Sequence, residues 1–150
     1  SRTGTSEQLA RAAADGAGEG GVLLRAEDCA PADLLSAGGY LFCCPENLAS
    51  MSGAMKEMFD RCYYPVLGQI EGRPYATIIA AGSDGEGAQR QIDRIATGWR
   101  LKRATEPWIV NTDAQEPEEI LAEKTVAQND IDQARQMGEA MAEGIAQGIF

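Results

Sequence analysis

Three stretches of the chain carry residue types suited to binding an anion or a flat polar ligand. Residues 1–6 are rich in hydroxyl groups, residues 45–51 include the polar residues Glu46, Asn47 and Ser50, and residues 82–87 are rich in glycine. Hydroxyl groups and free amides at the start of a helix bind anions, because these amides have no partner within the helix and its dipole is positive there. An ordinary capped helix is the alternative interpretation of residues 1–6, since Thr5 and Gln8 fit a capping box.

The sequence contains no histidine. This excludes Ser-His-Asp and Cys-His nucleophiles and any metal held by imidazole. It also removes the side chain best suited to proton transfer near neutrality. If the protein is an enzyme, a bound cofactor is therefore expected to carry the chemistry, with no catalytic side chain of its own.

The cysteines do not have the spacing of a metal site. They are Cys29, Cys43, Cys44 and Cys62. Zinc ligands usually come in pairs about two to four residues apart. We therefore predict no metal, and we interpret all four as reduced thiols that pack as small apolar side chains, which favours a cytoplasmic location.

Length and charge narrow the class of protein further. The 150 residues, 44% of them hydrophobic, predict a single domain over residues 1–150 with a substantial core. The net charge of −10 argues against a nucleic-acid surface, which needs a basic field. No apolar run approaches the roughly 20 residues that cross a bilayer, so no membrane association is expected.

Hydrophobic patterning predicts an α/β fold. Apolar runs that predict strands lie at residues 22–24, 40–44, 75–81 and 107–110. Between and after them, apolar residues recur at helical spacing, notably Met51, Met55, Met58, Phe59 and Cys62, then Ile92, Ile95, Ala96 and Trp99, and finally Ile131 to Ile149. Strands alternating with helices predict a doubly wound parallel sheet with helices on both faces.

Residues 16–21 match the pattern G-x-G-x-x-G, but they are not interpreted as a dinucleotide site. That fingerprint must follow a strand and open a helix. Here the glycines close a helix and precede the run at residues 22–24. They predict a helix-to-strand turn.

The order of these motifs resembles the flavodoxin-like NAD(P)H-dependent FMN reductases, especially the tryptophan-repressor-binding-protein type of quinone reductase. Residues 1–6 resemble that family's phosphate loop. Residues 45–53 and the helix after them resemble its flavin-ring loop, and residues 81–85 its second flavin-edge loop. The resemblance spans most of the chain and implies a five-stranded sheet of order 2-1-3-4-5.

The resemblance implies FMN as cofactor and NAD(P)H as co-substrate. Hydride would pass through flavin N5 to a quinone or another small acceptor, in a homodimer or homotetramer. The implied FMN-binding residues are Ser1, Arg2, Thr3, Gly4, Thr5 and Ser6, then Pro45, Glu46, Asn47, Leu48, Ala49, Ser50 and Met51, and finally Gly82, Ser83, Asp84 and Gly85. Arg90 and Arg94, in a basic stretch of an acidic chain, are the candidate residues for attracting the nucleotide, although a solvated helix face is the simpler interpretation.

One element of this fold is missing from the sequence pattern. The family's central first strand comes directly before the phosphate loop, whereas here the residues that resemble this loop are residues 1–6. A sheet cannot lose its middle strand and keep both faces covered. We therefore expect about six to eight apolar residues upstream of Ser1, or another segment in that position.

Two other functions remain open. A flavodoxin-type electron carrier would share the fold and the cofactor, but such carriers typically stack an aromatic side chain on the flavin, and residues 45–53 contain none. A binding or signalling module without a flavin is possible on the same fold. A receiver domain, however, would need an acidic pair at the end of the strand at residues 40–44, and none is present.

Overall fold

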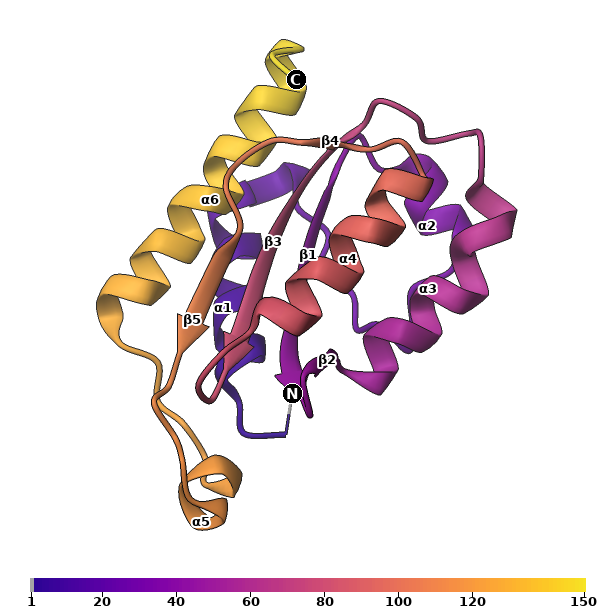
Figure 1. The fold of residues 1–150 in the computed structure, drawn as a ribbon. Coiled ribbons are helices and arrows are strands. Elements are labelled where there is room, and N and C mark those ends of the chain that lie inside the picture. Colours follow the sequence, from indigo (N-terminus) through magenta and orange to yellow (C-terminus); the bar gives the residue numbers. More distant parts are fainter. Residues whose placement is uncertain (1) are drawn as a thin grey trace.

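The structure, a computed structural model, describes residues 2–150 as one sheet with helices on both faces (Figure 1). Helices α1 (Thr5–Ala17) and α6 (Gln128–Gln147) cover one face. Helices α2 (Pro31–Ser36), α3 (Gly53–Val66) and α4 (Glu86–Gly98) cover the other. The predicted α/β architecture is therefore confirmed. No helix among residues 2–150 is both long and apolar enough to cross a membrane.

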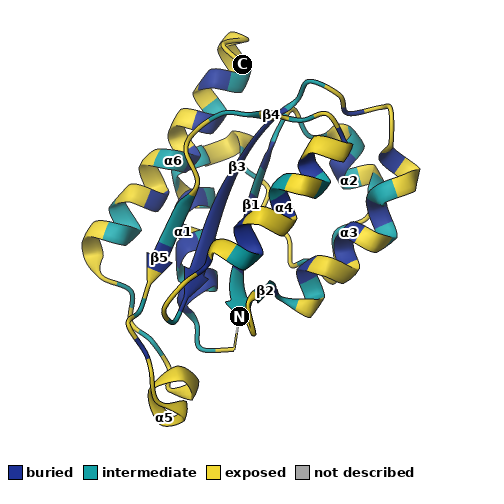
Figure 2. Ribbon diagram, in the orientation of Figure 1, coloured by how far each residue is buried: buried dark blue, intermediate teal, exposed yellow. Residues whose placement is uncertain are grey.

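The sheet is built on three parallel strands. Strand β3 (Pro74–Ala81) lies between β1 (Tyr40–Asn47) and β5 (Trp108–Asn111), with Cys44 opposite Ile79 and Ala80 opposite Val110. The short β4 (Lys102–Arg103) pairs with the start of β3, and β2 (Ser50–Met51) pairs antiparallel with the end of β1. Every residue of β3 is buried, which explains its continuous apolar sequence (Figure 2).

The predicted strand order is matched in part. Strands β1, β3 and β5 lie side by side as the third, fourth and fifth strands of the order 2-1-3-4-5. The prediction of a strand at residues 22–24 is wrong, because these residues form no strand and Val22 is 81% exposed. A strand needs a hydrogen-bonded neighbour. Along residues 40–45, β1 pairs with β3 only, within the part of the chain that the structure describes.

The remaining short elements agree with the turn and helix signals. Helix α1 ends at Ala17 and continues into the 3₁₀ turn η1 (Gly18–Gly20). The predicted turn is therefore confirmed at residues 18–20, whereas Gly16 and Ala17 are still helical and no strand follows at residues 22–24. Helix α5 (Pro117–Leu121) has its proline at the first position, where the missing N–H has no helical partner to lose.

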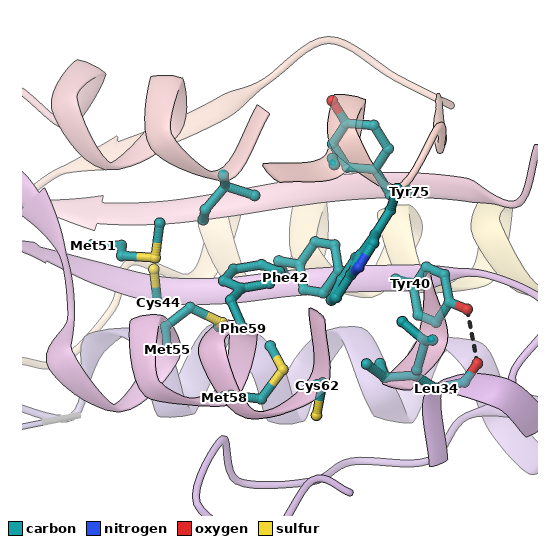
Figure 3. Close-up of a cluster of buried hydrophobic side chains, with 14 of the residues drawn as sticks. Leu34, Tyr40, Phe42, Cys44, Met51, Met55, Met58, Phe59, Cys62 and Tyr75 are labelled. Atoms are coloured by element: carbon teal, nitrogen blue, oxygen red, sulfur yellow. Dashed lines mark hydrogen bonds between the residues drawn. The ribbon is translucent and has the colours of Figure 1, made fainter. Parts of the chain in front are cut away.

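Alternation along β1 divides its side chains between two cores. Tyr40, Phe42 and Cys44 face α3 and α4, whereas Leu41 and Cys43 face α1 and α6. In the larger core, shown in Figure 3, the ring of Phe59 lies 5.1 Å from that of Phe42 and 5.4 Å from that of Trp99. The predicted buried helix face is confirmed for Met55, Met58, Phe59 and Cys62 of α3, whereas Met51, predicted as part of the same face, is buried in β2.

Helices α1 and α6 pack closely enough to require glycine. A Cβ atom at Gly138 would lie 1.8 Å from the carbonyl oxygen of Ala13, and one at Gly16 would lie 1.9 Å from that of Arg135. Both obstacles are backbone atoms, which cannot rotate away as a side chain can. The two helices can therefore approach this closely only because Gly16 and Gly138 have no side chain.

We expect Gly138→Ala to lower the free energy of unfolding by about 2 kcal/mol or more, because the added methyl group forces α1 and α6 apart. Urea unfolding followed by circular dichroism measures this. Gly53→Ala is the matched control, since a Cβ there has nothing within 4 Å, and it should leave stability unchanged or slightly raised. Equal stability of the two variants would contradict the close packing of α1 and α6.

Candidate functional site

The carboxyl ends of β1, β3 and β5 meet at one edge of the sheet, next to the start of α1 (Figure 1). A hollow opens there, as expected for ligand sites in open α/β sheets. It is lined by Arg2, Thr3, Thr5, Ser6, Pro45, Glu46, Asn47, Ala80, Ala81, Gly82, Thr112, Ala114, Ile120, Leu121 and Lys124.

The start of α1 forms the polar end of the hollow. Thr5 and Ser6 are the first residues of this helix, and their side chains are buried, with only 4% and 5% exposed. Neither hydroxyl has a hydrogen-bond partner in the described structure. A buried, unpartnered hydroxyl costs free energy, so two of them beside free helix amides indicate a site built for an anion.

The predicted capping box is wrong. The helix begins one residue earlier than expected, with Gly4 as N-cap at φ 90°, and the Thr5 hydroxyl caps nothing. The side chain of Gln8 bonds instead to the segment that leads from α5 to α6. Its Nε2 donates to the carbonyl oxygen of Lys124 at 2.7 Å, and its Oε1 accepts from the amide of Val126 at 3.2 Å.

Residues 45–51 form a tight hairpin, where the sequence predicted a polar loop. Asn47 pairs with Ser50, and the two residues between them, Leu48 and Ala49, have φ values of 51° and 59°. Positive φ at both central positions is the pattern of a type I′ turn, which normally takes Asn or Gly. Leu48 is fully exposed at the tip, so this turn places a strained apolar residue beside the hollow.

Glu46 joins this hairpin to α4. One carboxylate oxygen accepts from the amide of Gly85 at 2.9 Å, and the other accepts from the amide of Ala88, also at 2.9 Å. These amides belong to the start of α4, where a carboxylate is stabilised by the helix dipole. Gln91 strengthens the joint, because its Oε1 accepts from the amide of Met51 at 2.9 Å and from the hydroxyl of Ser50 at 3.0 Å.

The structure brings together about half of the predicted FMN-binding residues. Those that line the hollow are Arg2, Thr3, Thr5, Ser6, Pro45, Glu46, Asn47 and Gly82. The others described lie next to it without lining it, namely Gly4, Leu48, Ala49, Ser50, Met51, Ser83, Asp84 and Gly85. Ser1 lies outside the described residues.

The third stretch, residues 82–85, is a turn that leads into α4. Gly85 has φ 96°, a conformation that favours glycine, and a Cβ there would also lie 2.5 Å from the side chain of Ile109. The Asp84 carboxylate accepts from the amide of Glu86 at 3.3 Å. Ser83 and Asp84 are exposed, so this turn contributes backbone to the hollow through Gly82.

Sequence reasoning missed one whole wall of the hollow. Thr112 and Ala114 follow β5 and could have been found by applying the strand-end rule to this strand as well. Ile120 and Leu121 of α5, and Lys124 after it, carried no such signal, because they lie beyond a loop.

The predicted nucleotide residues Arg90 and Arg94 lie on the exposed side of α4, outside the lining of the hollow in the described structure. Arg90 makes a solvent-exposed ion pair with Glu86 at 3.7 Å. Elsewhere in the basic stretch, Arg103 pairs with Asp93. The stretch is therefore divided between a surface helix face and a structural ion pair.

The cysteines near the hollow supply no nucleophile. Burial raises the pKa of the Cys44 thiol to about 11, and burial is also the main cause that raises the pKa of Cys43. Both thiols are therefore protonated near neutrality, and a thiol is a far weaker nucleophile than a thiolate. The hollow offers binding groups instead: hydroxyls, amides, two cationic side chains and apolar strand ends.

Comparison with known proteins agrees with this geometry. Residues 30–114 match the model of a family described as NADPH-dependent FMN reductase. No curated protein matches the chain at the level of sequence.

Solved structures similar to the chain share its fold at low sequence identity. A flavodoxin from the domain Archaea has a TM-score of 0.74 and 15% identity, over 97% of this chain and 94% of that one. A WrbA-like flavodoxin from Agrobacterium tumefaciens has a TM-score of 0.68 and 16% identity, over 98% and 93%. An NAD(P)H:quinone oxidoreductase from Methanothermobacter marburgensis has a TM-score of 0.57 and 17% identity, over 94% and 90%.

We expect Glu46→Gln to destabilise the protein by about 2 kcal/mol, because an amide has one acceptor oxygen where the two amides of Gly85 and Ala88 need two. Chemical denaturation measures the loss. Glu106→Gln makes the same change at an exposed position and should alter stability by less than about 0.5 kcal/mol. If the Glu46→Gln protein is as stable as this control, the hydrogen bonds between Glu46 and α4 contribute nothing to the free energy of unfolding.

Proposed function

The chain belongs to the NADPH-dependent FMN reductase family, and from this premise we propose that it passes reducing equivalents from NAD(P)H, through bound FMN, to a quinone or another small acceptor. Family membership confirms the predicted family, and FMN with NAD(P)H as its cofactor and co-substrate. The similar structures confirm the flavodoxin-like fold. The acceptor, the homodimer or homotetramer and the cytoplasmic location stay predictions.

The observation that carries the proposal is the pair of buried hydroxyls at the start of α1. Thr5 and Ser6 lack partners and line the hollow. A phosphate monoester has about two negative charges near neutrality and three acceptor oxygens. It would satisfy both hydroxyls and the free amides of the first helical turn. The hollow thus fits the phosphate end of FMN.

The rest of the hollow suits a flat ring. Pro45 and Asn47 line it at the end of β1, and Ala80, Ala81 and Gly82 line it at the end of β3. The small side chains of Ala80 and Ala81 and the absence of one at Gly82 leave room for a ligand. Burial of apolar ring surface contributes roughly 25 cal/mol per Å². We expect this term to dominate affinity and the phosphate contacts to fix orientation.

The protein's own part in the reaction is binding and orientation. FMN, when bound, supplies the hydride chemistry that no side chain of this chain is suited to provide. The Glu46 carboxylate is already occupied by two amides, so its role is to hold the hairpin against α4. The hairpin then presents backbone groups to the ring.

The direct test is turnover by the purified protein. We expect added FMN to bind and NADH or NADPH to be oxidised rapidly when a benzoquinone is present, followed at 340 nm. Flavin binding without turnover would favour the electron-carrier alternative. Failure to bind FMN at all would contradict the proposal.

The nucleotide residues can be tested in the same assay. If Arg90 and Arg94 attract the nucleotide, replacing both by alanine should raise KM for NADH or NADPH several-fold and leave kcat unchanged, because a uniform loss of binding does not alter the chemical step. Glu86, the ion-pair partner of Arg90, remains in this variant. An unchanged KM would leave both arginines as surface residues.

We expect Thr5→Val and Ser6→Ala to weaken FMN binding by roughly tenfold each, because each removes a hydrogen bond to a charged group. The same changes should leave the stability of the flavin-free protein equal or higher, because they remove unpartnered buried hydroxyls. Fluorescence titration and urea unfolding measure the two effects. Thr105→Val, at an exposed position at the other end of the sheet, is the control. Loss of stability without loss of FMN affinity would reverse this interpretation of the hydroxyls.

A further inference from the structure

The wall of the hollow that the sequence did not reveal is one continuous segment, residues 112–126, here called the strap. It leaves β5, carries α5 away from the sheet and returns to the start of α6 (Figure 1). At its first end, the amide and the hydroxyl of Thr112 both donate to the carbonyl oxygen of Ala81, at 2.9 and 3.1 Å. The strap therefore begins at the end of β3, on the hollow.

The other end of the strap is bound to the start of α1. The amide of Lys124 donates to the carbonyl oxygen of Thr3 at 2.8 Å. The Gln8 side chain bonds to the carbonyl oxygen of Lys124 and the amide of Val126. Lys124 thus lies beside the same turn of helix that presents the hydroxyls of Thr5 and Ser6.

The ammonium group of Lys124 is only partly used by the protein. It donates to the carbonyl oxygens of Glu119 and Ala122 at the end of α5, the latter at 2.9 Å. An ammonium group has three donors. Among the described residues these two carbonyls are its hydrogen-bond partners, and no carboxylate pairs with it.

The charged residues that line the hollow also favour an anionic ligand. The chain carries a net charge of −10, yet the charged residues of this lining are Arg2, Glu46 and Lys124. Both oxygens of the Glu46 carboxylate are engaged by amides. The hollow is thus a locally cationic site in an acidic protein, which is the arrangement that concentrates an anionic ligand.

We propose that Lys124 binds the phosphate group of FMN, and that Gln8 is the positioning residue that holds it there. This inference rests on the proposed function, because the anion is the cofactor's own phosphate. The buried hydroxyls of Thr5 and Ser6 locate the anion, and the strap brings a compensating charge to it from more than a hundred residues away. The helix dipole alone would leave a dianion only partly neutralised.

Comparison of FMN with riboflavin isolates the phosphate contact. The two ligands share the ring and the ribityl chain and differ only in the phosphate group. We expect Lys124→Gln to weaken FMN binding about tenfold, as for loss of a charge-assisted hydrogen bond, and to leave riboflavin binding unchanged. Lys124→Arg should retain most of the FMN affinity, because it keeps the charge.

The matched control is Lys102→Gln. It makes the same change in net charge at an exposed position opposite Pro74, where β3 begins, at the far end of the sheet from the hollow. We expect it to alter neither affinity. FMN binding by Lys124→Gln should also depend less steeply on salt than that of the wild type, because one ionic contact is lost.

A double-mutant cycle tests the role of Gln8. If Gln8 acts through Lys124, Gln8→Ala should lower the ratio of FMN to riboflavin affinity in the wild type and have little further effect on that ratio in Lys124→Gln. If Gln8→Ala lowers this ratio by the same factor in the wild type and in Lys124→Gln, Gln8 acts independently of Lys124, and its assignment as a positioning residue is overturned.

The outcomes separate this inference from the proposed function. If the wild type binds FMN and Lys124→Gln weakens FMN and riboflavin equally, Lys124 merely supports α5 and the inference fails alone. If Lys124→Gln changes neither affinity, the inference also fails alone. If the wild type binds neither flavin, the proposed function fails and the inference falls with it.

Discussion

The site depends most on the two hydrogen bonds that the Glu46 carboxylate accepts from the start of α4. Strands β1 and β3 are already paired, but pairing fixes only the strands and leaves the segments beyond their ends free to diverge. Glu46 removes this freedom, because it comes from the end of β1 and accepts from two amides at the start of α4. The hairpin at residues 45–51 and the turn at residues 82–85 are therefore joined rigidly. This joint also stabilises the strained backbone conformation of Leu48 and Ala49.

The same edge shows how binding capacity is obtained at the expense of stability. The unpartnered hydroxyls of Thr5 and Ser6, the left-handed Leu48 and the exposed Ile120 and Leu121 are all unfavourable in the protein alone. They surround a single hollow, whereas β3 and the aromatic cluster around Phe59 are closely packed. A ligand that bonds to the hydroxyls and covers the apolar surface would recover this free energy on binding. The features that lower the stability of the free protein would then raise its affinity for the ligand.

Features that depend on local periodicity could be predicted from the sequence, whereas features that depend on distant pairing could not. The face of α3 followed directly from the spacing of Met55, Met58 and Phe59, and the buried run of β3 from its length and composition. The run at residues 22–24 is also apolar, yet it forms no strand, because an apolar composition supplies no neighbouring strand to pair with. The position of Gln8 predicted a local capping box, but its side chain bonds to the backbone of Lys124 and Val126, which lie 116 and 118 positions further along the chain.

The separation of roles in this chain follows from its composition. Without histidine, and with the thiols of Cys43 and Cys44 held protonated by burial, the described residues around the hollow offer neither an imidazole nor a thiolate. What they have is fixed geometry: amides, hydroxyls and two cations on elements locked by Glu46, Gln8 and Gln91. Such a site can orient a reactive cofactor without competing with it chemically, because the reactive groups belong to the cofactor.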